Sequence, residues 1–375
     1  MKILYIGPGF GSNMRLWLEY FGNKIDFDVY LLPTTSLSDE FKEMEGLRFV
    51  FGPRDLFDIV RFIKDVKKHE FDIIHVHGGY NKKLVLLLSQ ISKGKLIFNL
   101  WGQWFYDGLT DRSLLRSIYF KYIVNKSDLI FVNWWHLYLN LCDYSAEVKS
   151  KTRLTLWGNS MKHNLFYDVE KINREVKYSY NIEKDDFFIF IPRGMLRHNN
   201  IHLIIESLCL LKGRLRINEY EKIKVLIKTA NATDKQYLNE IEQYINEKKL
   251  GNIIIEEGIF SPNEYADLYS RADLSIYMSN NDMLTNAIVD GIYSKTNLIL
   301  SDISPYMELK NRYDLDVTLS KIGSKPLSEG ILTVLLRKDK KHLDNNLKKV
   351  GQDFVFEKNI EKTIRLYNEL ISGGK

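Results

Sequence analysis

DLSIYMSNNDMLTNAIVDG, residues 273–291, contains a strand, a polar turn and the start of a helix in one short segment. Residues 273–279 form a short apolar run that ends at turn residues, which is typical of a buried strand. Asn and Asp follow in the turn, and a helical pattern begins near Thr285. A strand that leads through a turn into a helix is part of a βαβ unit, and such units build parallel sheets with helices on both faces.

The same alternation extends along the chain on both sides of this segment. Longer segments with helical spacing separate the apolar runs, for example residues 234–249, and a last helix is predicted over 357–371. After Ser301 the pattern otherwise weakens. The other predicted strands are residues 2–7, 28–33, 47–51, 72–78, 95–102, 128–133, 152–158, 187–194, 223–230, 252–258 and 296–302.

A polar, charged stretch at 162–186 interrupts this rhythm and predicts a domain boundary. A chain of 375 residues is long enough to bury two cores. We therefore expect an α/β protein with one Rossmann-like domain over 1–165 and a second over 166–355. In such domains ligands bind at the carboxyl ends of the strands, so functional residues are expected there.

Composition excludes several classes of protein. The 53 basic and 48 acidic residues leave a net charge of +5, which is too small to indicate a nucleic-acid partner. Only two cysteines occur, and neither a signal peptide nor an apolar run of transmembrane length is present, so a cytoplasmic location is expected. Aromatic and basic residues cluster over 101–138, which we interpret as a candidate surface for peripheral contact with an anionic membrane.

Three strand ends in the amino half carry candidate residues. Gly9 and Gly11 precede a helix and could bring backbone amides to an anion, but the spacing does not fit a dinucleotide site. His77 could act as an acid, a base or a hydrogen-bond donor, or it could cap a turn, whereas His75 is expected in the core. Aromatic and polar side chains that could bind a sugar acceptor, or fill an interface instead, occupy Trp101, Gly102, Gln103 and Trp104.

Two strand ends in the carboxyl half carry the strongest candidates. Arg193 or Arg197 could stabilise a diphosphate leaving group, unless both are surface arginines of a solvated loop. Asp282 could accept hydrogen bonds from sugar hydroxyls, and Asp290 could reach a ribose. The alternative for this acid pair is an N-cap and a surface charge. The Asp-x-Asp pair at 26–28 lies at the wrong end of its strand and receives no function.

These motifs resemble the GT-B glycosyltransferases, and within them the retaining family four that builds bacterial surface polysaccharides. The resemblance covers nearly the full length and rests on MKILYIG, FDIIHVHG, FNLWG, LTLWGNS, PRG with IHLIIESL, EEGIFSPNEYADLYSRADLSIYMS and IEKTIRLYNELI. It implies a GT-B architecture, with two Rossmann-like parallel-sheet domains facing a central cleft. It also implies that the helix within 356–375 packs back on the first domain.

The resemblance also implies roles for individual residues. Asp282 and Asp290 stand where the family has two glutamates, the first on the donor sugar and the second on the ribose. Asn199 stands where the family has a lysine on the diphosphate, and Arg197 could supply the missing charge. The diphosphate would bind backbone amides at Leu284, Thr285 and Asn286, and the base would bind at Gly258, Ile259 and Phe260.

The function implied is transfer of a sugar from a nucleotide diphosphate donor to a glycan or lipid-linked glycan, in O-antigen, capsule or other lipopolysaccharide synthesis, with retention of configuration. No metal and no cofactor is expected, since the donor is a co-substrate. A nucleotide-sugar epimerase or an inverting transferase on the same fold is an alternative. A non-catalytic partner subunit is another, because Asn199 and the shortened acids depart from the family pattern.

Overall fold

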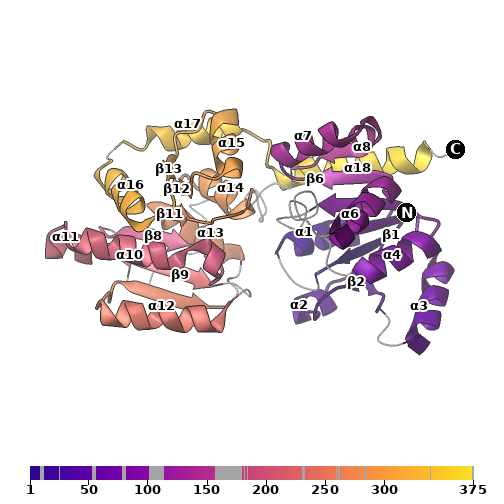
Figure 1. Cartoon of the computed structure of the whole chain (residues 1–375), viewed down its shortest axis with the longest axis horizontal. Coiled ribbons are helices and arrows are strands. Elements are labelled where there is room, and N and C mark those ends of the chain that lie inside the picture. Colours follow the sequence, from indigo (N-terminus) through magenta and orange to yellow (C-terminus); the bar gives the residue numbers. More distant parts are fainter. Residues whose placement is uncertain are drawn as a thin grey trace. The chain divides into compact units, whose positions relative to one another are not determined.

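The chain is divided into two compact units, Met1–Ser160 with Phe356–Lys375, and Met161–Val355 (Figure 1). The structure is a computed structural model, and each unit is considered by itself. The residues that it describes are 1–8, 12–24, 26–52, 56–77, 82–100, 114–156, 180, 182–183, 185–229, 233–258, 260, 262–282, 284–337 and 339–373.

The first unit is built on a parallel sheet of seven strands in the order β3-β2-β1-β4-β5-β6-β7. Ile3 in the central strand pairs with Val29 on one side and Ile73 on the other. The strands are β1 (Lys2–Gly7), β2 (Asp28–Pro33), β3 (Leu47–Phe49), β4 (Ile73–His77), β5 (Lys95–Leu100), β6 (Leu129–Val132) and β7 (Thr152–Leu154). The helices are α1 (Ser12–Gly22), α2 (Asp39–Lys42), α3 (Leu56–His69), α4 (Lys82–Ile91), α6 (Leu114–Lys126), α7 (Trp135–Tyr144), α8 (Ala146–Lys151) and α18 (Phe356–Ser372).

Helix α18 belongs to the core of the first unit although it is last in the sequence. It lies along this unit in yellow beside the violet helices in Figure 1. Phe356, Ile360 and Tyr367 are buried in one apolar cluster with β1, β2, β4 and α1. The Tyr367 hydroxyl lies 3.3 Å from the hydroxyl of Tyr5 and 2.5 Å from Nδ1 of His75. The first unit is therefore closed by residues from both ends of the chain.

The second unit is built on a parallel sheet of six strands in the order β10-β9-β8-β11-β12-β13. Its strands are β8 (Phe187–Ile191), β9 (Ile223–Thr229), β10 (Ile253–Glu257), β11 (Leu274–Tyr277), β12 (Asn297–Ser301) and β13 (Thr318–Ser320). Its helices are the 3-10 helix η2 (Arg197–Asn199), α10 (Ile201–Lys212), α11 (Ile217–Glu221), α12 (Lys235–Glu247), α13 (Pro262–Arg271), α14 (Asn286–Tyr293), α15 (Ser304–Arg312), α16 (Ser324–Leu336) and α17 (Lys341–Val350).

Strand order fixes where a ligand can bind in the second unit. β8 has β9 on one side and β11 on the other, so the direction of winding reverses between β8 and β11. Ile189 pairs with Leu274 and Phe190 with Ser275, so both strands end at the same edge. In open parallel sheets this reversal opens a crevice at the carboxyl ends. The loops after β8 and β11 therefore meet at the expected ligand position.

The prediction of two Rossmann-like parallel sheets is confirmed. β13 and helices α15 to α17 were not predicted; β13 has three residues, and α15 and α17 are largely polar. The boundary predicted between residues 165 and 166 lies outside the described residues. Among the helices that the structure describes, none is long and apolar enough to cross a bilayer.

Candidate functional site

Arg193 and Asp282 form an ion pair at the carboxyl ends of β8 and β11. Their side chains are 14% and 18% exposed. Arg193 Nη2 donates toward Asn199 Oδ1 at 2.9 Å, Ser279 Oγ at 3.0 Å and Asp282 Oδ2. Burial disfavours the charged guanidinium, but Asp282 outweighs burial, and the pKa of Arg193 is raised above its usual value. Arg193 is therefore a fixed, permanently charged group.

Tyr306, near the start of α15, holds the other partner of this pair. Its hydroxyl donates to Asp282 Oδ2 at 2.7 Å, and its side chain is fully buried. Burial, and after it the negative charge of Asp282, raise the pKa of Tyr306 well above 10, so the hydroxyl keeps its proton and remains a donor. Asp282 is consequently oriented by donors from the loop after β8 and from helix α15.

Two of the three guanidinium nitrogens of Arg193 have no acceptor among the described residues. All the hydrogen bonds of this side chain run through Nη2. Nε is buried without an acceptor in this part of the chain. A guanidinium has five N–H donors in a planar fork, and leaving buried donors unsatisfied is unfavourable. The geometry is that of an arginine locked at one end and ready to bind an anion with the other.

Asn199 contributes positioning and no charge. Its Oδ1 accepts from Arg193 and from Ser279 Oγ, the latter at 3.0 Å, and its Nδ2 donates to the carbonyl of Gly194 at 2.8 Å. The neighbouring Asn200 then ties the two loops together, because its Nδ2 donates to the carbonyl of Met278 at 2.7 Å. An amide in this place both donates and accepts, which a lysine could not do.

Helix α14 begins beside this cluster. Thr285 is its N-cap, and the side chain accepts from the amide of Ala287 at 3.4 Å. Leu284 is buried, and Asn286 is the first helical residue. The N-terminus of a helix presents free amides and a partial positive charge, which favour phosphate oxygens. The three residues that the sequence assigned to the diphosphate thus lie at a helix N-terminus.

Asp290 lies on α14 and is fully buried, so the alternative of a surface charge is wrong. Its negative charge is felt by three tyrosines of β11 and α13. Burial first, and Asp290 further, raise the pKa of Tyr265, Tyr269 and Tyr277 above 10. The hydroxyls of Tyr269 and Tyr277 donate to the carbonyl of Ala287 at 2.8 and 2.9 Å. Asp290 therefore lies near three tyrosines that stay neutral at pH 7.

Arg197 does not join the cluster. Its guanidinium is half exposed and points to α12, where Nη2 donates to Glu240 at 2.7 Å and Nε lies 3.8 Å from Asp234. The ring of Tyr237 lies under it, 5.1 Å from Cζ. The alternative of a surface arginine fits this geometry. Of the two arginines predicted, the structure brings only Arg193 to Asp282.

His77 lies at the end of β4 and is fully buried. Its ring stacks on that of His75 with centroids 4.0 Å apart, and the rings of Tyr5 and Trp17 lie 5.5 and 5.6 Å away. Burial lowers the pKa of His77 to about 3 and also lowers that of His75. Both histidines are therefore neutral at pH 7, and His75, as predicted, is a core residue.

This burial predicts that the first unit is sensitive to acid. A histidine in the unfolded chain has a pKa near 6.5. Below that pH the unfolded state therefore binds protons that the folded state, with its lower histidine pKa values, does not bind. Stability is full above about pH 6.5 and falls toward pH 3. Between pH 7.5 and 5.5 we expect a loss of about 1.4 kcal/mol per buried histidine. Urea unfolding at the two pH values measures it.

His77→Gln should reduce this pH dependence, while the control His136→Gln on α7 should retain it. Equal pH dependence in both variants would contradict the assignment of the acid sensitivity to the buried pair.

The other predicted residues are divided between described and undescribed parts of the chain. Gly258, with φ +120°, and Phe260 follow β10 at the same edge as Arg193. The remaining predictions lie outside the described residues: Gly9, Gly11, Trp101, Gly102, Gln103, Trp104 and Ile259. Tyr306 and Lys228 were missed. Lys228 had a signal, because it is a cation near the end of an otherwise apolar strand.

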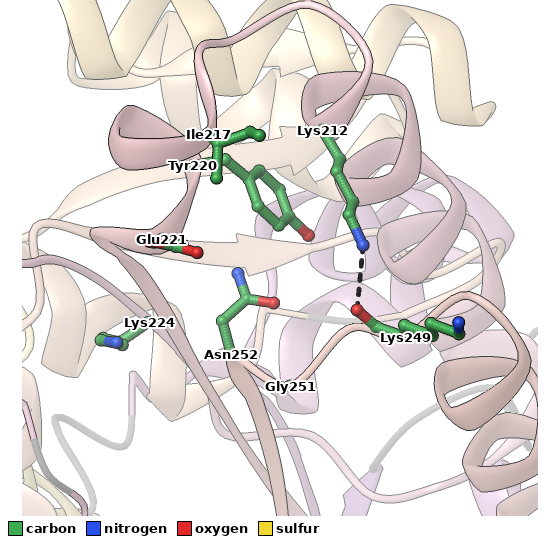
Figure 2. A pocket seen from close by; sticks show the side chains of 8 residues that line it. All are labelled: Lys212, Ile217, Tyr220, Glu221, Lys224, Lys249, Gly251 and Asn252. Carbon is green, nitrogen blue, oxygen red and sulfur yellow. Dashed lines mark hydrogen bonds between the residues drawn. The ribbon is translucent and has the colours of Figure 1, made fainter.

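Three pockets of about 300 to 410 Å³ among the described residues are not lined by Arg193 or Asp282. One of about 410 Å³ lies at the amino ends of β9 and β10, where the side chains of Lys212, Tyr220 and Asn252 point to its middle (Figure 2). Lys212 Nζ already donates to the carbonyl of Lys249 at 2.9 Å. This pocket lies at the opposite ends of the strands from Arg193, so pocket volume does not identify the candidate site. Among the described residues, no group of His, Cys, Asp or Glu side chains could hold a metal ion.

Comparison with known proteins gives likeness in structure only. No family model and no curated sequence matches the chain. HepE from Anabaena, solved in complex with UDP, has a TM-score of 0.74 at 14% identity and covers 98% of this chain and 100% of its own. A glycosyltransferase from Rickettsia africae has a TM-score of 0.77 at 17% identity, covering 99% and 98%. WaaG, a glycosyltransferase involved in lipopolysaccharide biosynthesis, has 0.71 at 8%, covering 96% and 98%. The fold is that of the GT-B glycosyltransferases.

Proposed function

We propose that this chain is a glycosyltransferase that takes a sugar from a nucleotide diphosphate donor. The observation that carries the proposal is Arg193, locked by Asn199 and Asp282 with two guanidinium nitrogens unsatisfied among the described residues. The N-terminus of α14 lies at the same strand ends. Structures of similar fold were solved with UDP and with UDP-glucose, which supports the choice of donor.

In this proposal Arg193 stabilises the leaving group. When the bond between sugar and diphosphate breaks, negative charge develops on the phosphate oxygens. A fixed guanidinium and the amides of α14 would meet that charge without rearrangement, which is the most effective form of electrostatic stabilisation. Asp282 would accept hydrogen bonds from the donor sugar, and Asp290 would contact the ribose of the nucleotide. Protein groups then do the work that a metal ion does in other transferases.

The finer parts of the proposal rest on the family resemblance. We propose a lipid-linked or oligosaccharide acceptor in O-antigen or capsule synthesis, with retention of configuration, at the cytoplasmic face of a membrane. The similarity in fold to WaaG supports a role in surface polysaccharide. Product stereochemistry measured by NMR tests retention. Co-sedimentation with anionic vesicles at low salt tests the membrane contact of the aromatic segment 101–138.

Thermal stabilisation by nucleotide-sugars tests the donor site. A ligand at about 100 times its dissociation constant adds roughly 2.7 kcal/mol of stability. For a unit of this size, that is a rise in Tm of about 5–10 °C. We expect the rise with one class among UDP-, GDP-, ADP-, CMP- and dTDP-sugars.

The rise should disappear in Asp290→Asn, which keeps the shape of the side chain and removes its charge. The control variant is Arg197→Ala, which should retain it. No rise with any nucleotide would favour the non-catalytic partner subunit, and nucleotide binding with epimerised product would favour the epimerase.

A further inference from the structure

Lys228 is a buried cation that the proposed mechanism does not use. It lies one residue before the end of β9 and is 5% exposed. Its Nζ is 3.2 Å from Glu256 Oε1 and 3.6 Å from the ring centroid of Phe260. Lysine is almost never fully buried unless it is paired, as Lys228 is with Glu256, since removing an ammonium from water is costly. A charge held there at the carboxyl edge of the sheet points to a ligand.

The Nζ atom of Lys228 lies beside the turn that follows β10. Gly258 has φ +120°, and a Cβ built on it would lie 3.9 Å from Lys228 Nζ. The amide of Gly258 donates to the carbonyl of Thr229 at 3.2 Å, so the ends of β9 and β10 are joined. The ammonium therefore lies beside this turn and against the Phe260 ring.

A row of aromatic rings connects Lys228 with Arg193. Phe260 lies 6.3 Å from Phe190, and Phe190 lies 5.9 Å from Tyr265. Tyr265 lies 4.9 Å from Tyr269, and the Tyr269 hydroxyl is 2.5 Å from that of Tyr277. Arg193 Cζ closes the row, 6.0 Å from the Tyr277 ring. Lys228 and Arg193 therefore lie at the two ends of one row of aromatic rings, most of them fully buried.

The sheet order sets the direction of a ligand along the carboxyl edge. β9, which carries Lys228, and β11 are separated by two strand spacings, or about 10 Å. A diphosphate at Arg193 and the α14 N-terminus would place the nucleoside toward β9 and β10. The end at Lys228 is then the base end.

We infer that Lys228 selects the nucleobase of the donor, by donating from Nζ to a ring carbonyl while Glu256 accepts from the adjacent ring N–H. This inference rests on the proposed function and extends it. Glu256 is held for this role, because its other oxygen accepts from the Tyr180 hydroxyl. Uracil, thymine and guanine carry a carbonyl beside a ring N–H, whereas adenine offers an amino group beside a bare ring nitrogen. The donor is therefore a nucleotide of a keto base and not of adenine.

Isothermal titration calorimetry with UDP, GDP and ADP tests the inference on the full chain. The variant is Lys228→Met, which keeps the length of the side chain. The matched control is Lys224→Met, four residues earlier on the same strand and on the same face by alternation. We expect wild type to bind UDP or GDP more tightly than ADP. Lys228→Met should weaken the preferred nucleotide about 10- to 100-fold and leave ADP unchanged.

Other outcomes overturn the inference in distinguishable ways. An equal loss for all three nucleotides in Lys228→Met would make the lysine a phosphate ligand. Unchanged binding would make it a structural residue, and a preference for ADP in wild type would refute the choice of base. If wild type binds none of the three, the proposed function itself fails. If Lys228→Met proves too unstable to measure, Glu256→Gln replaces it, because glutamine has the same size. This variant should also weaken binding of the keto-base nucleotide.

Discussion

Arg193→Ala is expected to lower kcat for sugar transfer about 10²- to 10³-fold or more. Loss of one preorganised donor to a developing charge commonly has an effect of this size. Arg193 forms an ion pair with Asp282, which precedes the N-cap of α14 by three residues. Its removal also deprives Asn199 and Ser279 of their shared donor. Steady-state kinetics with the donor identified by thermal shift measures the effect.

Two variants separate charge from geometry at this position. Arg193→Lys keeps the charge but cannot bond through a fork, so it should recover only part of the lost activity. Arg197→Ala should stay close to wild type, since Arg197 bonds to α12. Because Arg193→Ala leaves Asp282 without its cation, about 3 kcal/mol of stability should be lost as well. Assays therefore belong well below the melting temperature, and near-normal activity there would refute the role of Arg193.

Tyr367→Ala is expected to reduce the stability of the first unit by about 3–5 kcal/mol. The side chain is fully buried, and its ring stacks on Phe21 and Phe131 with centroids 5.8 and 6.4 Å away. Its hydroxyl bonds to His75 and Tyr5. Truncation would leave a cavity and two polar groups without a partner. Denaturant unfolding, followed by a probe in the first unit, measures the loss.

The control Tyr367→Phe keeps the ring and removes only the hydroxyl. It should lose about 1–3 kcal/mol, because His75 Nδ1 then lacks its hydrogen-bond partner. An exposed position on the same helix, Glu361→Ala, should change stability by less than about 0.5 kcal/mol. If Tyr367→Ala were as stable as Glu361→Ala, α18 would not be part of the core.

Local pattern was sufficient to predict the sheets and part of the site. Buried parallel strands are continuous apolar runs, so residues 187–191 and 274–277 were recognisable as strands. In βαβ units the residues after a strand lie at one common edge. Arg193 and Asp282 follow two such strands, and for that reason they could be expected to meet. The adjacency of β8 and β11 brings them together.

Other features depended on contacts that no local pattern contains. Arg193 and Arg197 stand in one loop, and only the carboxylate of Glu240 on α12 explains why Arg197 turns away. From the sequence, His77 could equally be an acid, base or hydrogen-bond donor or a cap of a turn. The rings of Tyr5 and Trp17 pack against it, and it is fully buried. Tyr306 follows β12 in a polar region without periodicity. Its bond to Asp282 spans 24 residues of sequence.

The position of α18 in the sequence has a consequence for folding during translation. Residues 1–160 emerge early, but the helix that completes their core is translated after the whole second unit. Until then Tyr5, Phe21 and Phe131 lack their contacts with Tyr367. The second unit is contiguous in sequence, so it can fold before α18 is available to complete the core of the first unit. While the second unit is being translated, the nascent chain therefore exposes apolar surface of the first unit. Such surface is a binding site for chaperones.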